Sequence, residues 1–179
     1  KFAQYKVALS TVNNKVYGVP FDSGTAVTAL RTDIISKAGY TINDFKDITW
    51  SKFIENAKNV LNKTKMPLLS AQAGSPDLVM MMLQSAGTWA FKDDKIYIAD
   101  NPVLQKAVDV YVNLVKSGLL IEVNNWDQYV ATFNTDKVAG AMTGCWILAS
   151  VQSNTDQKGK WAVTNIPKLD DIDNATNYS

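Results

Sequence analysis

The sequence of 179 residues predicts one folding unit of the α/β class, with helices flanking a partly parallel sheet. Short apolar segments with the composition of strands alternate with longer segments in which apolar residues recur at helical spacing. The sequence contains no internal repeat and no low-complexity linker that would divide the chain.

The first strand-like segments flank a polar turn. Residues 16–19 favour a short strand, which Pro20 should end because proline has no amide hydrogen. The sequence Asp-Ser-Gly at residues 22–24 then favours an exposed turn, and residues 26–30 return to an apolar strand. The polar turn therefore lies between two strands, where a cleft can open.

Two helices are expected in the next part of the chain. Residues 31–39 predict a brief helix that ends at Gly39. Thr49 can cap a longer helix, which should run to about Lys63 because its apolar residues share one helical face. A buried strand is expected at residues 66–71.

Ser75 followed by Pro76 is a strong signal for the start of a helix. The serine hydroxyl can accept a hydrogen bond from an otherwise unpaired amide, and proline at the first helical position lacks one. The helix expected at residues 77–86 is apolar on nearly every side, which predicts burial. Its consecutive methionines at residues 80–82 are therefore interpreted as core residues and not as cofactor contacts.

The remaining elements follow from the same signals. Asn101-Pro102 opens the clearest helix of the chain, which should end at Gly118. The other elements expected are a bend at 88–95, a strand at 96–98, a short helix at 126–133, a strand at 138–142 stopped by Gly144, a helix at 146–152, a last strand at 160–167 and a polar end at 170–179.

Composition excludes several classes of function. The 18 Lys and Arg residues nearly balance the 17 Asp and Glu residues without any block of like charge, so no nucleic-acid partner is expected. Histidine is absent and Cys145 is the single cysteine, which removes histidine-dependent catalytic groups, histidine-containing zinc sites and any disulfide within the chain. Cys145 is interpreted as a small buried residue, and no cofactor or metal site is expected.

A series of short motifs occurs along most of the chain, from about Lys15 to Pro167. In order they are KVYGVPFDSG at 15–24, RTD at 31–33, TWSKF at 49–53, SAG at 85–87 before WAF at 89–91, DNP at 100–102, FNTDKVA at 133–139 and TGCW at 143–146. Their order and spacing resemble those of the extracellular solute-binding proteins of ABC transporters, in the carbohydrate-binding branch that includes the maltose-binding protein family.

The resemblance implies a periplasmic-binding-protein-like (type II) lobe with a mixed, mostly parallel sheet flanked by helices. Members of the family have a hinge between two lobes, so the chain is expected to be a second-lobe fragment. Residues 1–20 would be a hinge-proximal segment and a strand of the first lobe, residues 21–167 the second (C-terminal) lobe, and residues 168–179 a polar tail leading back to the first lobe. Residues 21–25 would form the hinge and the binding edge before the second lobe continues at residue 26, and residues 161–167 would be the return crossing. The two crossing strands should then lie close together.

The resemblance also implies a function. A sugar or oligosaccharide would be captured between the lobes without catalysis and delivered to the permease subunits of an ABC transporter. The protein would be a monomer outside the cytoplasm, either a cell-surface lipoprotein or periplasmic, and would need no cofactor.

Sugar recognition needs an apolar platform for one face of the ring and polar groups for the hydroxyls. Trp146 is the candidate platform, because it follows a strand end and can project from the carboxyl edge of the sheet, and the resemblance assigns it the same role. The alternative is that Trp146 is a core residue. Asp22 can bridge neighbouring hydroxyls or only stabilise its own turn, and Ser23 and Thr25 are further polar candidates, while Gly24 would let a ligand approach the backbone.

Three further residues complete the candidate ligand site. Ser75 and Asp77 lie in a segment that resembles a ligand-contacting loop of the family, although a serine there can be a helix cap and nothing more. Trp126 precedes a short helix and can stack on a ligand or pack between lobes. The other tryptophans, Trp50, Trp89 and Trp161, are interpreted as structural.

Two alternative functions stay open. A hydrolase acting on carbohydrates would use paired carboxylates, and Asp22, Asp77 and Asp127 are the residues that would have to converge. A ligand-sensing domain of a membrane receptor would share the fold.

Overall fold

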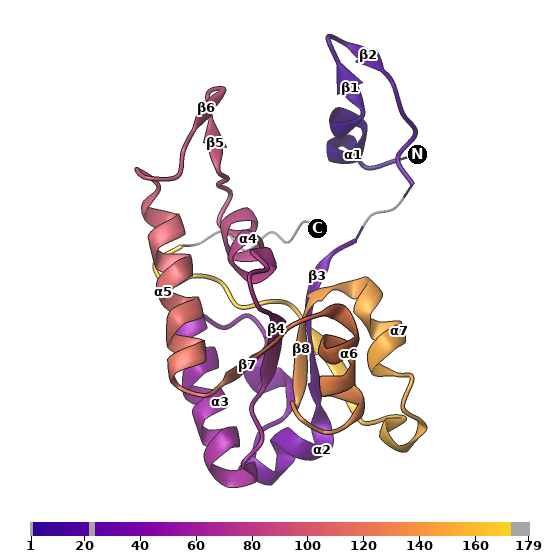
Figure 1. The fold of residues 1–179 in the computed structure, drawn as a ribbon, viewed down its shortest axis with the longest axis vertical. Helices are drawn as coiled ribbons and strands as arrows, with labels where there is room; N and C mark the ends of the chain where they lie inside the picture. Colours follow the sequence, from indigo (N-terminus) through magenta and orange to yellow (C-terminus); the bar gives the residue numbers. More distant parts are fainter. Residues whose placement is uncertain (1, 22–23, 173–179) are drawn as a thin grey trace.

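The computed structural model describes residues 2–21 and 24–172 (Figure 1). The chain begins with helix α1 (Gln4–Leu9) and a hairpin of strands β1 (Thr11–Val12) and β2 (Lys15–Val16). The turn residues Asn13 and Asn14 both have positive φ, as a two-residue hairpin turn requires. The strand expected at 16–19 is thus shorter than expected and begins earlier, and α1 was not expected.

The principal strands lie side by side in the body of the molecule. They are β3 (Ala26–Arg31), β4 (Leu69–Gln72), β7 (Leu120–Val123), β8 (Gly140–Gly144) and β9 (Trp161–Thr164). Strand β3 is paired antiparallel with β8 on one side and β9 on the other, and β4 is paired parallel with β7. The backbone amide of Ala139 donates to the carbonyl of Pro67 at 2.9 Å, which joins the start of β8 to the start of β4.

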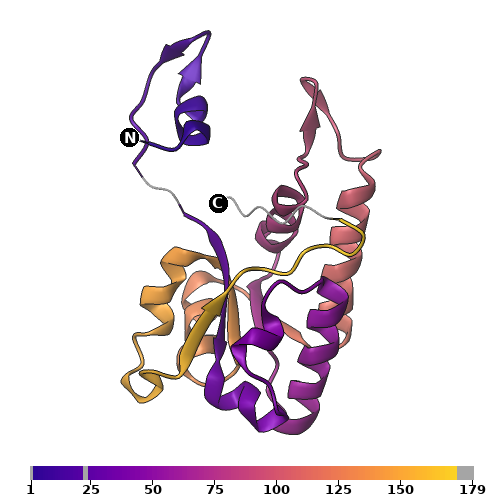
Figure 2. The same cartoon turned by 180° about the vertical axis from the view of Figure 1, so that it is seen from behind.

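The mixed α/β arrangement is therefore confirmed. Strands β4, β7, β8 and β9 share one direction, and β3 runs against them (Figure 1). The β3–β9 pairing places Thr28 opposite Thr164, so the two segments expected to cross between lobes are neighbours, as seen from behind in Figure 2. Strand β7 was not expected from the sequence.

The expected helices form, and polar side chains cap three of them. The helices are α2 (Thr32–Ile35), α3 (Trp50–Thr64), α4 (Asp77–Ser85), α5 (Pro102–Lys116), α6 (Trp126–Asn134) and α7 (Leu148–Val151). Thr49 Oγ1 accepts from the Lys52 amide at the start of α3, and Asn101 Oδ1 accepts from two amides of α5. Within the described ranges, no helix combines the length and apolar composition needed to cross a bilayer.

One hairpin replaces the expected bend and strand at 88–98. Strands β5 (Phe91–Lys92) and β6 (Lys95–Ile96) are joined by Asp93 and Asp94, which have φ values of 51° and 58°. Aspartate adopts this conformation more readily than most residues, so the pair can form a two-residue turn that the sequence pattern did not reveal.

The core lies on both faces of the sheet. Met142 of β8 belongs to the larger cluster, which contains the fully buried Trp50 and Phe53 of α3. The neighbouring Ala141 belongs to a smaller cluster that α6 and α7 cover, with Phe133 at its centre. Adjacent residues of a strand point to opposite faces, so the two clusters are separated by the sheet. The structural interpretation of Trp50 is confirmed.

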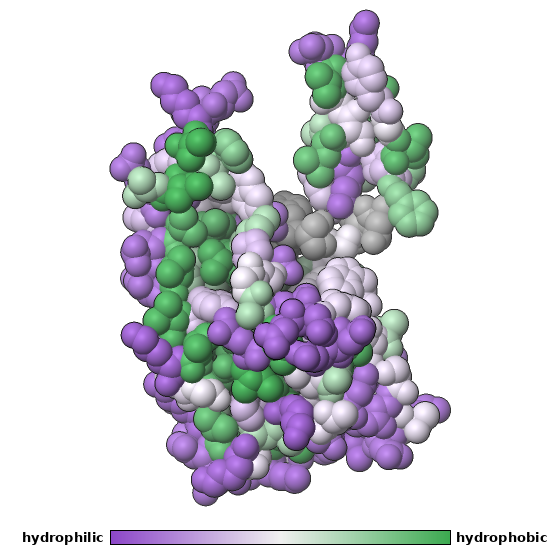
Figure 3. All heavy atoms as spheres, viewed as in Figure 1, coloured by the Kyte–Doolittle hydropathy of each residue, from purple (hydrophilic) through white to green (hydrophobic). Residues whose placement is uncertain are grey.

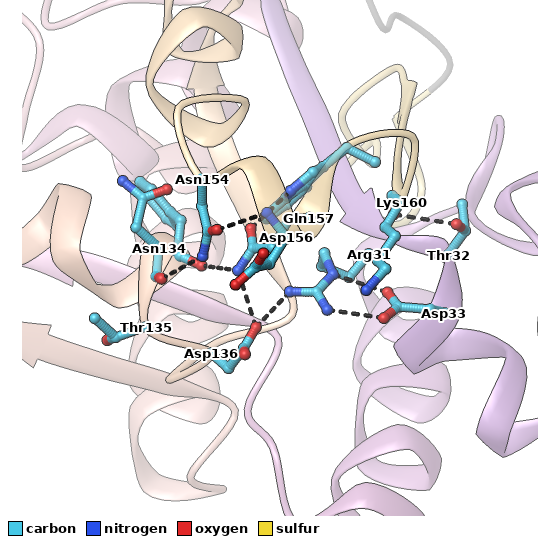
Figure 4. A network of polar contacts seen from close by, with 12 residues as sticks. Arg31, Thr32, Asp33, Asn134, Thr135, Asp136, Asn154, Asp156, Gln157 and Lys160 are labelled. Atoms are coloured by element: carbon cyan, nitrogen blue, oxygen red, sulfur yellow. Dashed lines mark hydrogen bonds and ion pairs between the residues drawn. The ribbon is translucent and has the colours of Figure 1, made fainter.

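A polar network fixes the end of β3 that lies far from Gly144 (Figure 4). The buried guanidinium of Arg31 donates to both carboxylate oxygens of Asp33 at 2.8 Å and to Asp136. Gln157 also donates to Asp136, and the Trp161 indole donates to Gln157 at 3.0 Å. The hydrogen bond from Arg31 lowers the pKa of Asp33 below its ordinary value, and the same bond raises the pKa of Arg31.

Candidate functional site

A shallow hollow lies where β4 and β8 end, and it measures about 490 Å³ when the open space at its mouth is included. Helix α4 follows β4, helix α6 follows β7, and a 3₁₀ turn (Cys145–Ile147) follows β8. Since these three strands share one direction, the segments that follow them meet at one edge of the sheet, where ligands commonly bind in α/β folds. The hollow is lined by Leu69, Ser70, Ala71, Gln72, Ser75, Asp77, Leu78, Met81, Trp126, Tyr129, Met142, Thr143 and Trp146.

Three aromatic rings form a continuous row in this hollow. The centroid of Trp126 lies 5.5 Å from that of Trp146 and 5.5 Å from that of Tyr129. Tyr129 in turn packs edge-to-face on Phe133 in the core. Trp146 is 50% exposed and Trp126 41% exposed, so the outer two rings present apolar surface to solvent while the inner ring anchors them.

The start of α6 sets the place of Trp126. The Asn125 side chain accepts from the Gln128 amide at 2.9 Å, and the Gln128 side chain accepts from the Asn124 amide at 2.9 Å. These reciprocal bonds satisfy amide groups that an uncapped helix leaves unpaired. Trp126 is the first residue of α6, and it lines the hollow.

Trp146 is placed by the turn after β8. The Cys145 amide donates to the carbonyl of Thr25 at 2.8 Å, which joins this turn to the segment that enters β3. The Trp146 indole folds back over Gly144, which has no side chain to obstruct it. Cys145 is partly buried and does not line the hollow.

Tyr129 is a site residue that the sequence interpretation missed. Its ring is 6% exposed and packs in the core, yet the residue lines the hollow, and no described residue forms a hydrogen bond with its hydroxyl. Burial raises the pKa of Tyr129, and the nearby carboxylate of Asp77 raises that pKa further. The phenol is therefore neutral at physiological pH and can donate to an acceptor in the hollow. The spacing of Tyr129 and Phe133 indicated only a core face.

The start of α4 contributes polar groups on the opposite side. Ser75 Oγ accepts from the Asp77 amide at 3.3 Å, just before α4, whose N-cap residue is Pro76, and Ser75 also lines the hollow. Asp77 is exposed. Ser70 is already bonded to Thr132 at 2.7 Å, whereas Gln72 and Thr143 form no side-chain hydrogen bond with other described residues.

The hollow is only weakly charged. Asp77 is the single charged residue among the described residues that line it, and no lysine or arginine accompanies it. No group of three or more potential metal ligands occurs within residues 2–21 and 24–172. An uncharged ligand with several hydroxyl groups therefore fits the lining better than a phosphate or another anion would.

A second hollow adjoins the first and is also lined by Trp146. It measures about 600 Å³ including open space and shares Asp77, Met81, Thr143 and Trp146 with the first. The residues that belong to it alone are Met80, Gln84 and Gly144. Trp146 thus borders both of these adjoining hollows.

The structure brings together half of the candidate residues. Ser75, Asp77, Trp126 and Trp146 all line the first hollow. Asp22 and Ser23 lie outside the described residues. Gly24 is buried and Thr25 exposed beside the turn of Trp146, but neither lines the hollow, and Asp127 is exposed outside it. The ligand role of each of these residues stays a prediction.

The comparisons with known proteins agree with one another. The whole chain, residues 1–179, matches the family described as bacterial extracellular solute-binding protein. The chain is 38% identical over 176 residues to the lactose-binding protein of Rhizobium radiobacter, which covers 98% of this chain and 42% of that protein. It is 22% identical over 172 residues to the arabinooligosaccharide-binding protein of Bacillus subtilis strain 168, covering 93% and 39%.

Solved structures confirm the fold. The ABC transporter associated binding protein from B. animalis subsp. lactis Bl-04, in complex with β-1,6-galactobiose, aligns with a TM-score of 0.82 at 19% identity, over 99% of this chain and 45% of that chain. The expected type II periplasmic-binding-protein-like lobe is therefore confirmed as the fold class. The chain spans less than half the length of these relatives.

Proposed function

The chain belongs to the bacterial extracellular solute-binding proteins, and we propose that it forms part of a protein that captures a sugar or oligosaccharide for an ABC permease. Capture is non-catalytic: the ligand enters the hollow at the sheet edge, is bound, and is released unchanged. Ligand binding favours a closed arrangement of two lobes, and the permease recognises that arrangement.

The observation that carries this proposal is the row of Trp146, Trp126 and Tyr129 beside uncharged polar groups. A sugar ring has an apolar C–H face and a rim of hydroxyls. The exposed indoles offer a surface for the face, and Tyr129 and Gln72 offer hydrogen bonds to the rim. Asp77 supplies one charged acceptor, which forms stronger bonds with hydroxyl groups than a neutral acceptor does.

The ligand class is supported by the relatives' names. The two curated relatives are named for lactose and for arabinooligosaccharides, and the solved structure described above contains a galactobiose. From these names we infer only the chemical class of the ligand of this protein, a neutral saccharide. We do not infer which sugar it is.

We propose the same lobe organisation that the sequence predicts. Residues 1–20 belong to the first lobe, residues 21–167 form the second lobe, and residues 168–179 lead back to the first. In support, the N-terminal element exposes much apolar surface, visible as the green areas of the separate upper part in Figure 3. Its exposed large apolar residues are Phe2, Leu9, Val12, Val16, Tyr17, Val19 and Phe21. Such surface is expected where further protein packs against it.

The partners and location follow from the same proposal. The permease subunits of an ABC transporter are the protein partner, the protein acts as a monomer, and no nucleic acid is involved. An extracellular family acts outside the cytoplasm, and we propose either a lipid anchor at the cell surface or residence in a periplasm.

The test is a titration of the complete protein with a panel of neutral mono-, di- and oligosaccharides by isothermal calorimetry. At least one sugar should bind, and Trp146→Ala should weaken its binding about tenfold or more, as expected when a stacking surface is lost. Binding of the best sugar with equal affinity in Trp146→Ala would contradict the platform assignment. Failure of every saccharide to bind would contradict the function itself.

The hydrolase alternative is tested on the same samples. Of its carboxylates, Asp77 lines the hollow and Asp127 does not. Chromatography of the bound sugar after prolonged incubation should recover it intact. Shorter products would support a hydrolase, whereas an intact sugar together with stimulated permease ATPase activity in reconstituted vesicles would support transport over a sensor role.

A further inference from the structure

We propose that Gly144 is a positioning residue for the sugar site: because it lacks a side chain, it fixes the Trp146 indole where it borders the two hollows. The inference rests on the proposed sugar-binding function and assigns a role to a residue that does not itself supply a binding group.

The argument begins with the space beside Gly144. A Cβ atom built on this residue would overlap Nε1 of the Trp146 indole, and would lie 2.6 Å from its Cδ1 and 3.0 Å from its Cε2. All three nearest atoms belong to the same indole, and no backbone atom is among them. Any side chain at position 144 therefore requires the indole to move.

The backbone does not explain the glycine. Gly144 has φ −60° and ψ 149°, an extended conformation that every L-residue adopts. Gly140, at the other end of the same strand, differs: a Cβ there would lie 2.9 Å from the Leu68 carbonyl oxygen and 3.1 Å from that of Ala29. Gly140 is required by the packing of strands, whereas the nearest obstruction to a side chain at Gly144 is the indole of Trp146.

The position of the indole determines the shape of both hollows. Trp146 borders the first hollow with Trp126, and it borders the second hollow with Met80 and Gln84. Pushing the ring away from Gly144 separates it from Trp126 or narrows the second hollow. Gly144 should therefore affect selectivity between ligands that occupy one hollow and ligands that span both, namely mono- and disaccharides.

The experiment compares Gly144→Ala, Trp146→Ala and the double variant in the complete protein. Gly18→Ala is the matched control, because a Cβ there would meet only Ser10 atoms at 3.8 Å or more. Tryptophan fluorescence of the ligand-free protein should shift in Gly144→Ala but not in Gly18→Ala. The affinity of Gly144→Ala for the best disaccharide should fall about tenfold, and by less for a monosaccharide that binds.

The double variant separates positioning from a structural role. If Gly144 acts through the indole, adding Gly144→Ala to a protein that already carries Trp146→Ala should have little further effect on affinity. If Gly144→Ala lowers the melting temperature, the added Trp146→Ala should restore it, since the obstructing ring is gone.

The inference would be overturned if Gly144→Ala showed both unchanged tryptophan fluorescence and wild-type affinity. It would also be overturned if Gly144→Ala lost stability that the added Trp146→Ala did not restore. If the wild-type protein binds no sugar, the proposed function fails, but the fluorescence and rescue measurements still decide whether Gly144 positions Trp146.

Discussion

The indoles of Trp126 and Trp146 lie against each other with centroids 5.5 Å apart and planes inclined by 43°. One indole begins helix α6 and the other follows strand β8, and the two rings pack against each other at the sheet edge. The pair is therefore a composite surface whose two rings come from different parts of the chain.

Replacing Trp126 should weaken sugar binding even if the sugar touches only Trp146. Trp126→Ala removes one side of the ring contact with Trp146, and we expect a loss of about 5- to 30-fold in affinity, ~1–2 kcal/mol. Calorimetric titration of the complete protein measures this loss of affinity. Phe91→Ala is the control, because Phe91 is a 60% exposed aromatic residue on the β5–β6 hairpin, outside both hollows. Equal losses in the two variants would show a general effect of removing an aromatic residue.

Removing a single hydroxyl tests the hydrogen-bonding role of Tyr129. Tyr129→Phe keeps the packed ring and should leave stability nearly unchanged, while affinity for the sugar falls by ~0.5–1.5 kcal/mol, the usual contribution of one hydrogen bond. Tyr111→Phe is the matched control, because its hydroxyl donates to Glu122 at 2.6 Å outside the site. Binding that is as tight in Tyr129→Phe as in the wild type would exclude the phenol as a ligand group.

The Tyr111–Glu122 bond also predicts behaviour at high pH. Burial, and then the bond to Glu122, raise the pKa of Tyr111 to about 12. A tyrosine whose pKa is higher in the folded state stabilises the fold below its ordinary pKa of 10, and this contribution is lost as pH rises through about 12. Thermal unfolding between about pH 9 and pH 12 should therefore show a smaller loss of stability in Tyr111→Phe than in the wild type. An equal loss of stability with pH in Tyr111→Phe and in the wild type would contradict the raised pKa of Tyr111.

The Arg31–Asp33 pair predicts the opposite dependence at low pH. The pKa of Asp33 is lowered below its ordinary 3.8 by the hydrogen bond from Arg31, so its contribution is present above pH 3.8 and is lost as pH falls through the folded-state pKa. Asp33→Asn should be less stable than the wild type at neutral pH, because the buried guanidinium loses a partner. The difference in melting temperature should shrink as pH is lowered to about 2. A difference that is constant with pH would show that the charge of Asp33 is not involved.

Gly140 should be intolerant of substitution for a reason unrelated to the site. In Gly140→Ala the new methyl group would lie 2.6 Å from Leu30 Cδ2 and close to two backbone carbonyls. Crowding of this kind typically costs ~1–3 kcal/mol, which urea unfolding would measure. Ligand affinity per folded molecule should be unaffected, and a selective loss of binding at unchanged stability would contradict this explanation.

The elements that the sequence predicted well carry their signals locally. Helices α3, α5 and α6 are capped by Thr49, Asn101 and Asn125, and two of these caps stand directly before long apolar periodicities. Strand β7 was missed because its apolar residues follow the end of α5 in a run too short to distinguish from a loop. The β5–β6 hairpin was misread because its turn uses two aspartates in place of the usual glycine.

The candidate residues of the site came from position in the chain and from the resemblance to the family. Trp146 became a candidate because it follows a strand end and the resemblance assigns it a ligand role, whereas Asp77 became one because its segment resembles a ligand-contacting loop. Tyr129 was not recognised, because its helical spacing indicates the core and only the fold shows that its hydroxyl side borders a hollow. The contact of Arg31 with Asp136 joins residues far apart in the sequence, so no local pattern could reveal it.

The pairing of β3 with its two neighbours has a mechanical consequence. Ala26 at the start of β3 lies opposite Gly144, and the end of β9 near Thr164 lies beside the same end of β3. The chain thus enters and leaves the sheet at the edge that carries Trp146. A rotation about an axis through these two connections moves Trp146 through a short arc and the Arg31 end of the sheet through a long one. For any given rotation of this kind, the far end of the sheet is therefore displaced more than the indole is.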